Sequence, residues 1–569
     1  MRLSHHAPRP ASMLFILLAF VCIPASAHDL IFQSGFQTVA DAPGSDAEAA
    51  RFLTMATFGP TREEISRLRG IGYAQWISQQ LAMPTTLERP TIEALDAGVK
   101  NPGQSDRTAL WFKIAITAPD QLRQRTAWAL SQIMVVSDQG NKLKQDPVAL
   151  AEYYDVLARD AFGYYDDTGM YHVGTYRNLL TDVTYSPAMG KMLTYVHNDK
   201  GDPSMQVSPD ENYAREVLQL FSIGLIERNL DFSPVLDNGN TIPTYDQDVV
   251  TGNAHVFTGL GYDPQYSNGF YSYPTNGQAW TIADYRPMFC YETHHDEIPK
   301  SVLDGQIIDN PAPNCASDFT QLLGIIANHP NVAPFISRQL IQRFTSSNPT
   351  PAYIQRVATV FVNSGGDLGA VISAILTDPE AAYAAPALPA PFVFGKPREP
   401  LLKLTALWRY YNAAAHNGMY RVNGVATNYG QAPLDSHSVF NFYSPDYQPP
   451  GEMASAGLYA PEFQIESESS LVATANDLNA RIKAFVGADG VGDGTVAVDL
   501  SSLFALSSNP TALVDQINHD LMYGSMGSAM RDTLIQLAGL IPFSTAAPQP
   551  RVLGVLQVVL ASPAFSIQK

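Results

Sequence analysis

One short stretch carries two carboxylates and a guanidinium at a spacing suited to chemistry. Glu211 and Arg215 are four residues apart, and Glu216 follows directly. Residues four apart share a helix face, and an acid that precedes a base is the favourable order for an ion pair. The pattern therefore predicts either a salt bridge that fixes helix packing or a charged wall that orients a polar substrate.

A second group combines a carboxylate with an imidazole. Asp248 and His255 are seven residues apart, close to two helical turns, so both side chains project from one face of an expected helix. With Glu211 they could hold a divalent metal through oxygen and nitrogen atoms, or form a base with its orienting acid. A hydrogen-bonded histidine in the core is the alternative interpretation.

The third group, His294-His295-Asp296, lies in an irregular stretch. Adjacent histidines on a loop can bind zinc or copper, although no third ligand follows at a typical spacing. Loops carry function more often than the elements that they connect. The candidate catalytic residues are thus Glu211, Arg215, Glu216, Asp248, His255, His295 and Asp296, and the candidate metal ligands are Asp248, His255, His294 and His295.

Signatures of well-known enzyme classes are missing from the sequence. It contains no G-x-S-x-G, no H-E-x-x-H, no P-loop, no G-x-G-x-x-G after a strand and no C-x-x-C. Their absence disfavours a serine hydrolase, a zincin, an NTPase and a dinucleotide enzyme. A carboxylate pair for glycoside hydrolysis stays open, because the separation of the pair is spatial.

Charge limits the kinds of partner. The chain has 35 Lys and Arg against 54 Asp and Glu, a formal net charge of -19. Such a surface repels phosphate backbones and anionic lipid heads, so we expect no binding to nucleic acid or to a membrane surface. Carbohydrate, peptide and cationic partners remain open.

The first residues have the order of a cleavable export signal. Arg2 and Arg9 precede an apolar run at residues 13–21, and Ala25-Ser26-Ala27 resembles a cleavage site. The run is shorter than the ~20 residues that a membrane-spanning helix needs. We therefore expect a signal peptide at residues 1–27 and an exposed segment at 28–46. The mature protein is expected to be periplasmic or secreted, without an integral membrane segment.

The cysteines agree with export. Of the 3 cysteines, Cys22 lies in the signal, which leaves Cys290 and Cys315 in an oxidising compartment. An even pair there is most simply a disulfide, with buried free thiols as the alternative. Its closed loop would contribute about 3 kcal/mol to stability on the loop-entropy model.

Helices must position most of these groups. Apolar residues recur at helical spacing near 122–133, 218–225 and 336–344, and Thr61 with Glu64 reads as a capping box before a helix that ends near Gly70. A second helix is expected at 73–81. We expect a mainly α fold with little β structure: a large multi-helix domain over residues 47–569, with a loop-rich insertion at 262–316. The Pro-rich connector at 384–396 either separates two lobes or crosses one helical domain.

Several segments carry a family resemblance: residues 50–61, 122–131, 438–445 and 460–463, His295-Asp296 with Lys300, and Glu211-Asn212-Tyr213-Ala214-Arg215-Glu216, which is the most characteristic. They resemble the bacterial family called domain of unknown function 1800 (DUF1800). The resemblance implies an exported, mainly helical protein and assigns no reaction. Asp210 departs from it, since the family often has Asn there. Members are often encoded beside an exported family that resembles phosphatases and sulfatases, domain of unknown function 1501 (DUF1501), which implies a partner of that kind.

Two functions follow as hypotheses. The leading one is an extracytoplasmic binding or assembly protein that acts with a partner, in which the charged helix and the insertion form a recognition surface. The alternative is an extracytoplasmic hydrolase, metal-dependent or acid/base, with its candidate groups in one pocket, namely Glu211, Asp248, His255 and His295. Convergence of those four side chains would favour the hydrolase. A divalent metal is the one cofactor that these residues suggest.

Overall fold

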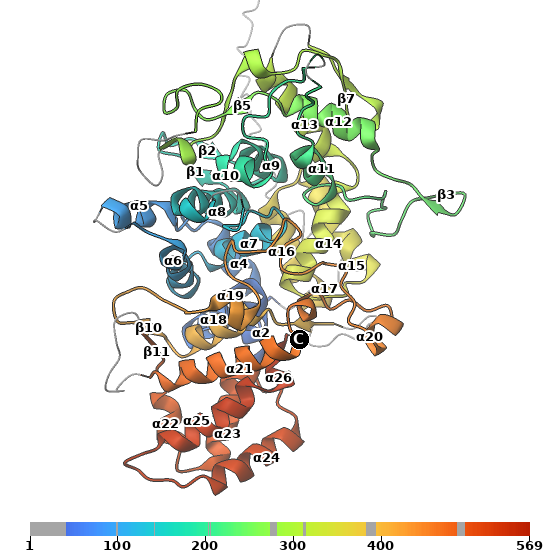
Figure 1. The fold of residues 1–569 in the computed structure, drawn as a ribbon. Coiled ribbons are helices and arrows are strands. Elements are labelled where there is room, and N and C mark those ends of the chain that lie inside the picture. Colours follow the sequence, from blue (N-terminus) through green and yellow to red (C-terminus); the bar gives the residue numbers. More distant parts are fainter. Residues whose placement is uncertain are drawn as a thin grey trace, which may run out of the picture. The chain divides into compact units, whose positions relative to one another are not determined.

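Amphipathic helices make up most of the chain, as the apolar spacing predicted, and the fold is mainly α (Figure 1). The computed structural model describes residues 41–97, 101–140, 143–202, 204, 206–273, 282–310, 314–382, 394–485 and 495–568. All of them belong to one compact unit, Gln37–Lys569. The expected signal peptide at 1–27, residues 28–40 of the segment after it and 384–393 of the Pro-rich connector lie outside the described residues.

The N-terminal part is a succession of helices that pack on one another. They are α2 (Asp46–Ala56), α3 (Arg62–Ile71), α4 (Tyr73–Leu81), α5 (Arg89–Ala97), α6 (Gln104–Thr117), α7 (Gln121–Ser131) and α8 (Pro147–Phe162). Helix α7 is buried on every side, with neighbours α4, α6, α8 and α14. It therefore runs through the centre of the fold.

The middle part contains the candidate chemistry. Its first elements are β1 (Tyr164–Tyr165), β2 (Tyr171–His172), α9 (Tyr176–Tyr185), α10 (Pro187–Met192), α11 (Asn212–Gln219), β3 (Leu236–Asp237), β4 (Asn240–Thr241) and α12 (Gln247–Val256). Strand β5 (Leu260–Gly261) leads into the insertion, which contains β6 (Phe289–Cys290), β7 (Lys300–Ser301) and β8 (Ile307–Ile308). Five helices and a strand complete the middle part: α13 (Cys315–Asn328), α14 (Val332–Phe344), α15 (Pro351–Asn363), α16 (Leu368–Thr377), α17 (Pro379–Ala382) and β9 (Lys396–Pro397).

The C-terminal part returns to helices. It comprises α18 (Pro400–Tyr410), β10 (Ala414–Ala415), α19 (Val425–Tyr429), α20 (Glu452–Ser455), α21 (Glu468–Lys483), β11 (Val496–Ala497), α22 (Ser501–Leu506), α23 (Pro510–Met522), α24 (Ser528–Leu540), α25 (Gln549–Leu560), α26 (Pro563–Ser566) and β12 (Ile567–Gln568). The strands of the described residues pair only two by two, and all pairs are antiparallel: β1–β2, β3–β4, β5–β6, β7–β8, β9–β12 and β10–β11. The expectation of little β structure is confirmed.

Local signals predicted some boundaries well. Thr61 Oγ1 accepts a hydrogen bond from Glu64 N at 3.1 Å and caps α3. The Glu64 carboxylate instead accepts from Trp76 Nε1 at 2.8 Å, so a tertiary contact takes the side chain that a capping box would use. Gly72, with φ +82, separates α3 from α4, which begins at Tyr73 as predicted.

The expected helix through residues 218–225 is wrong in extent. Helix α11 ends at Gln219, and Ile223 N and Gly224 N both donate to Leu218 O at 3.0 Å. Gly224 has φ +72, and a Cβ there would lie 2.7 Å from the Phe335 ring. A left-handed residue ends a helix and favours glycine. The apolar residues beyond Gln219 therefore enter the core from a turn.

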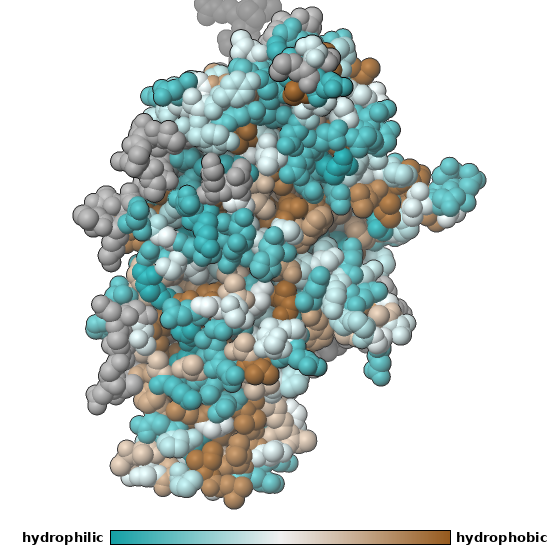
Figure 2. Space-filling model, viewed as in Figure 1, coloured by the Kyte–Doolittle hydropathy of each residue, from teal (hydrophilic) through white to brown (hydrophobic). Residues whose placement is uncertain are grey.

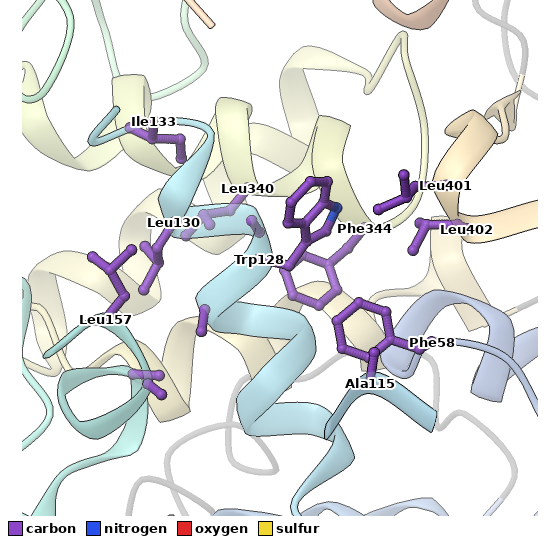
Figure 3. Close-up of a cluster of buried hydrophobic side chains, with 14 of the residues drawn as sticks. Phe58, Ala115, Trp128, Leu130, Ile133, Leu157, Leu340, Phe344, Leu401 and Leu402 are labelled. Atoms are coloured by element: carbon purple, nitrogen blue, oxygen red, sulfur yellow. The ribbon is translucent and has the colours of Figure 1, made fainter. Parts of the chain in front are cut away.

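Aromatic side chains fill the centre of the core. Trp128 of α7 is fully buried and belongs to one hydrophobic cluster with Phe344 of α14 and Leu401 of α18 (Figure 3). Each such ring removes about 150–250 Å² from water, so a few of them dominate the stability of a helical core. Segments more than 200 residues apart in the chain therefore meet at Trp128.

The outer surface differs between the two ends of the fold. Hydrophobic residues gather over α23, α24 and α25 in the view of Figure 2, where Leu540 is 82% exposed. Hydrophilic residues prevail near the insertion in the same view. Within the part of the chain that the structure describes, no helix has both the length and the apolar character needed to cross a membrane.

Candidate functional site

Four histidines meet where the insertion packs on α12 and α13. Backbone hydrogen bonds join three segments there: His197 N donates to Leu260 O at 2.7 Å, and Lys200 N donates to His294 O at 3.0 Å. The β5–β6 pair joins the residues directly before the insertion to its middle. We call this site the histidine layer; its members are His197, His255, His294 and His295 with Asp199, Asp296 and Asp318.

Helix α12 approaches the insertion unusually closely. A Cβ at Gly252 would lie 1.7 Å from Ser301 O of β7, so only glycine permits this packing. The contact fixes the position of α12 relative to β7 of the insertion. It thereby sets the position of His255, which lies almost one turn further along the same helix.

His255 and Asp296 form the best-defined pair. His255 Nδ1 lies 2.6 Å from Asp296 Oδ2, with side chains 19% and 10% exposed. Thr258 Oγ1 donates to His255 O at 2.7 Å and accepts from Asp296 N at 2.9 Å, which locks the two segments together. A carboxylate on Nδ1 leaves Nε2 as the nitrogen for proton transfer. The pair therefore has the geometry of a base with its orienting acid.

Hydrogen bonds control the charge of Asp296. Burial raises the pKa of a carboxyl group, but the hydrogen bond with His255, that from Ile298 N and the charge of Lys300 outweigh it, so the pKa of Asp296 lies below its ordinary value. Asp296 is consequently ionised at neutral pH, which is the form that stabilises a protonated His255.

His295 lies deeper and is fully buried. Its Nδ1 is 2.9 Å from Thr258 O, and its Nε2 is 3.0 Å from Asp318 Oδ2. Lys300 Nζ also donates to Asp318 Oδ2, at 2.7 Å, and Asn310 donates to the other oxygen. Burial raises the pKa of Asp318, yet these hydrogen bonds hold it below its ordinary value. With both nitrogens engaged, His295 has a structural role in this geometry.

His294 belongs to the outer face of the layer. Its Nδ1 lies 3.1 Å from Asp199 Oδ1, and its ring stacks on Phe270 with centroids 3.9 Å apart. Tyr271, which is 63% exposed, also donates to Asp199. A polar pair and an aromatic stack thus hold the outer rings of the insertion in place.

His197 differs from the other three because no carboxylate pairs with it among the described residues. The rings of Tyr262, Phe270 and Tyr273 surround it edge-on at 4.8 to 5.6 Å. Burial lowers the pKa of His197 to about 4, since these surroundings disfavour the charged imidazolium. His197 is therefore neutral at pH 7.

The disulfide predicted from the cysteine count is confirmed. Cys290 of β6 is bonded to Cys315, the first residue of α13, with the two Cα atoms 6.1 Å apart. Cys315 N also donates to Glu292 Oε2 at 3.0 Å. The insertion is therefore tied covalently to the helix that carries Asp318.

The Glu211 group has contacts of its own and connects α11 with α12. Glu211 precedes the first residue of α11, so it is outside the helix on which we expected it. Its carboxylate pairs with Arg215 at 3.1 Å and accepts from Gln247 and Thr251 of α12 at 2.9 Å. Glu216 is buried, and burial raises its pKa. The contacts match the structural interpretation, a salt bridge that fixes helix packing.

The four side chains of the expected pocket do not share one set of contacts. Asp248 is exposed in the first turn of α12, whereas His255 and His295 bind different carboxylates. Within the described residues, no group of three or more His, Cys, Asp or Glu side chains is arranged to hold a metal ion. The layer thus offers paired imidazoles and carboxylates for acid/base chemistry.

Sequence reasoning missed three partner residues of the layer, namely Asp199, Lys300 and Asp318. Lys300 stood in a segment that carried the family resemblance, which was a usable signal. Asp199 and Asp318 had none, because they pair with histidines 95 and 23 residues away. Partners at such separations become neighbours only in the folded chain.

The fold and the layer define a mainly α-helical protein with a disulfide-linked, histidine-rich insertion. The chain belongs to the family described as Protein of unknown function (DUF1800), whose model matches residues 51–567. No curated protein and no solved structure matches it. The family assigns no reaction, so a function must be argued from the site.

Proposed function

We propose that this is an exported binding or assembly protein that recognises its partner through the insertion. The observation that carries the proposal is a set of aromatic rings exposed there: Tyr271 is 63%, Phe289 47% and Tyr273 46% exposed. Exposed aromatic residues are enriched at the centres of protein interfaces, where they contribute much of the binding energy.

Packing and the disulfide restrict the motion of these exposed rings on the insertion. Phe289 packs edge-on against Tyr291 at 5.2 Å, and Phe270 against Tyr271 at 4.9 Å. The disulfide holds Cys290, next to Phe289, against α13. A surface that is ordered before binding loses less entropy when it binds, which supports a recognition role.

The partner that we propose is an exported protein of the phosphatase- and sulfatase-like family DUF1501, which the family resemblance implies. A negative net charge of -19 favours a partner with a basic docking surface. Asp199 and Glu297, whose side chains are 29% and 54% exposed, supply negative charge beside the rings.

The test measures binding of the mature protein to that purified partner by biolayer interferometry. Tyr271→Ala with Phe289→Ala should weaken binding by more than about tenfold, as expected when interface anchors are removed. Tyr165→Ala is the matched control, because Tyr165 is 74% exposed on β1, outside the insertion. Absence of binding by the unmodified protein, or equal losses in both variants, would contradict the proposal.

A second function has its own supporting observation. The 2.6 Å contact between His255 Nδ1 and Asp296 Oδ2 favours an acid/base hydrolase in which His255 Nε2 takes a proton from water. Chromogenic ester, phosphate and glycoside substrates test it. Turnover should fall at least about 100-fold in His255→Ala, the usual contribution of a general base, and stay unchanged in Glu211→Gln. Turnover that survives in His255→Ala would rule out this role.

A further inference from the structure

A second set of charged groups lies in the centre of the fold, beside Trp128. We call it the arginine network; its members are Arg125, Arg343, Lys396, Arg398, Glu399 and Glu462. All six are at most 4% exposed. They come from α7, α14, β9 and the residues before α18, and from the irregular segment 431–466. Nε1 of the Trp128 ring, which Figure 3 draws, donates to Glu399 Oε2 at 2.9 Å.

Two of the four cations are paired with carboxylates. Lys396 Nζ lies 2.8 Å from Glu462 Oε1 and donates to Gln342 O at 2.7 Å and Arg343 O at 3.0 Å. Arg125 Nη2 lies 3.8 Å from Glu399 Oε1, beyond hydrogen-bond distance, and donates to Arg343 O at 2.6 Å. Arg343 and Arg398 have no carboxylate within 4.0 Å among the described residues.

The network consequently holds more positive than negative charge. Four cations face two carboxylates, and the neighbouring pair Lys403 and Glu466 adds one of each. This excess of two stands in a chain whose net charge is -19. Burying an unpaired charge is costly, so the site has a physical need for an anion.

Donors for such an anion are in place and unused. Arg125 Nε and Nη1 and Arg398 Nε and Nη1 are buried without a hydrogen-bond partner among the described residues. The Arg343 guanidinium lies over the Tyr443 ring at 4.5 Å, and the Tyr443 hydroxyl is also buried without a partner. Guanidinium groups present forked donors that match carboxylate and phosphate oxygens.

The segment over the network is irregular and strained. Leu434 has φ +50 and Asn441 has φ +67, values that non-glycine residues seldom adopt. Strained backbone of this kind concentrates at ligand clamps and active sites. Asn441, Tyr443 and Glu462 stand in the segments that resemble the family, as does Arg125 of α7. Distant parts of the chain that carry the resemblance therefore meet at this one site.

We infer that the arginine network is a binding site for a small oxyanion, a molecule with carboxylate or phosphate oxygens, enclosed under residues 431–466. The anion would be held by Arg125 and Arg343 with the Tyr443 hydroxyl. This site is separate from the insertion, so it stands whether or not the insertion binds a partner. Internal water alone is the competing occupant, since water also fills sites with unpaired polar groups.

The experiment titrates inorganic phosphate and citrate into the full mature protein by isothermal titration calorimetry, with sodium chloride at equal ionic strength as the reference. Saturable one-to-one binding of at least one oxyanion is expected. Arg343→Gln should weaken it by at least about tenfold, and Tyr443→Phe by about two- to tenfold, the value of one hydrogen bond. Arg531→Gln, the same charge change at an exposed pair on α24, should leave the affinity unchanged.

Tyr443→Phe keeps the ring over Arg343, so it decides the matter if Arg343→Gln does not fold. A protein that binds neither phosphate nor citrate would overturn the proposal and leave water as the occupant. Binding that is equal in Tyr443→Phe and the unmodified protein would overturn it as well. A crystal structure grown with the bound oxyanion should show density against Arg125 and Arg343.

Discussion

The histidine layer and the arginine network solve the problem of buried charge in opposite ways. In the layer, each ionised carboxylate at depth has its donors, as Asp318 has from Lys300, His295 and Asn310. In the network, guanidinium groups outnumber carboxylates, and Arg125 and Arg398 leave donors unused. Fully satisfied polar groups rigidify a fold, whereas each unsatisfied buried group needs an explanation, such as a bound ion or water.

The comparison also shows which residue types attract attention in a sequence. Neighbouring histidines and carboxylates in a sequence suggest a catalytic or metal site. The layer contains such residues, but its most deeply buried pairs have a structural role. The network is built from arginine, lysine and glutamate, which usually form the solvated surface of a protein. Their burial is therefore the informative observation, and burial becomes visible only in the structure.

Removal of one buried charge should give the largest effect. Glu399→Gln leaves the fully buried Arg125 without its carboxylate partner, so the free energy of unfolding should fall by about 3–5 kcal/mol. Urea denaturation followed by circular dichroism measures it. Glu211→Gln makes the same change at a half-exposed pair and should cost less than about 1 kcal/mol. Similar losses in both variants would remove the contrast between the buried and the exposed pair.

Removal of the disulfide should give the second-largest loss of stability, with the structural change confined to the insertion. Cys290→Ser with Cys315→Ser opens a loop of 25 residues, which lowers stability by about 3 kcal/mol. Hydrogen exchange should rise in residues 282–310 and stay unchanged near Trp128. Thiol titration of the unfolded, unreduced mature protein should detect no free thiol; two thiols would refute the bond.

A pH effect should come next, and within the layer it comes mainly from His197. The folded pKa of His197 is about 4, below the ~6.5 of an unfolded histidine, so the unfolded state takes up a proton first as the pH falls. His197 therefore contributes stability that is fully present above about pH 6.5 and is lost as the pH falls toward 4.

Urea midpoints between pH 7 and pH 4.5 measure this contribution. His197→Gln, which cannot titrate, should reduce the slope of the curve in that window. His416→Gln, at an exposed histidine, should not change the slope. Asp296 and Asp318 act lower, because their depressed pKa values make stability fall only below about pH 4. An unchanged slope in His197→Gln would mean that His197 is not held neutral by its surroundings.

The smallest effect is expected at Asp248. This side chain is exposed in the first turn of α12, so Asp248→Asn should change the free energy of unfolding by no more than about 0.5 kcal/mol. Mass spectrometry of bound metal should give the same metal content for this variant and the unmodified protein. A stoichiometric metal that Asp248→Asn releases would restore the metal-dependent hydrolase.

Much of the fold could be predicted because the signals of a helix, its cap and its apolar spacing, lie within a few residues of one another in the sequence. The cap at Thr61, the spacing through α7 and α14 and the step from Asp248 to His255 all identified real helices. The error at residues 218–225 arose because buried apolar residues in a turn imitate a helical stripe. At the candidate site, the sequence identified His255 and Asp296 separately, but it could not show that they pair across 41 residues.

The sequence by itself determined the helical class, the family and the pairing of two cysteines, because periodicity, motif order and an even cysteine count are properties of the chain. The tertiary structure alone decided which charges are buried together. Trp128 and Glu399 are 271 residues apart, and no local rule predicts their hydrogen bond. Which charges pair, and which remain without a partner, depends on packing that brings remote segments into one buried site.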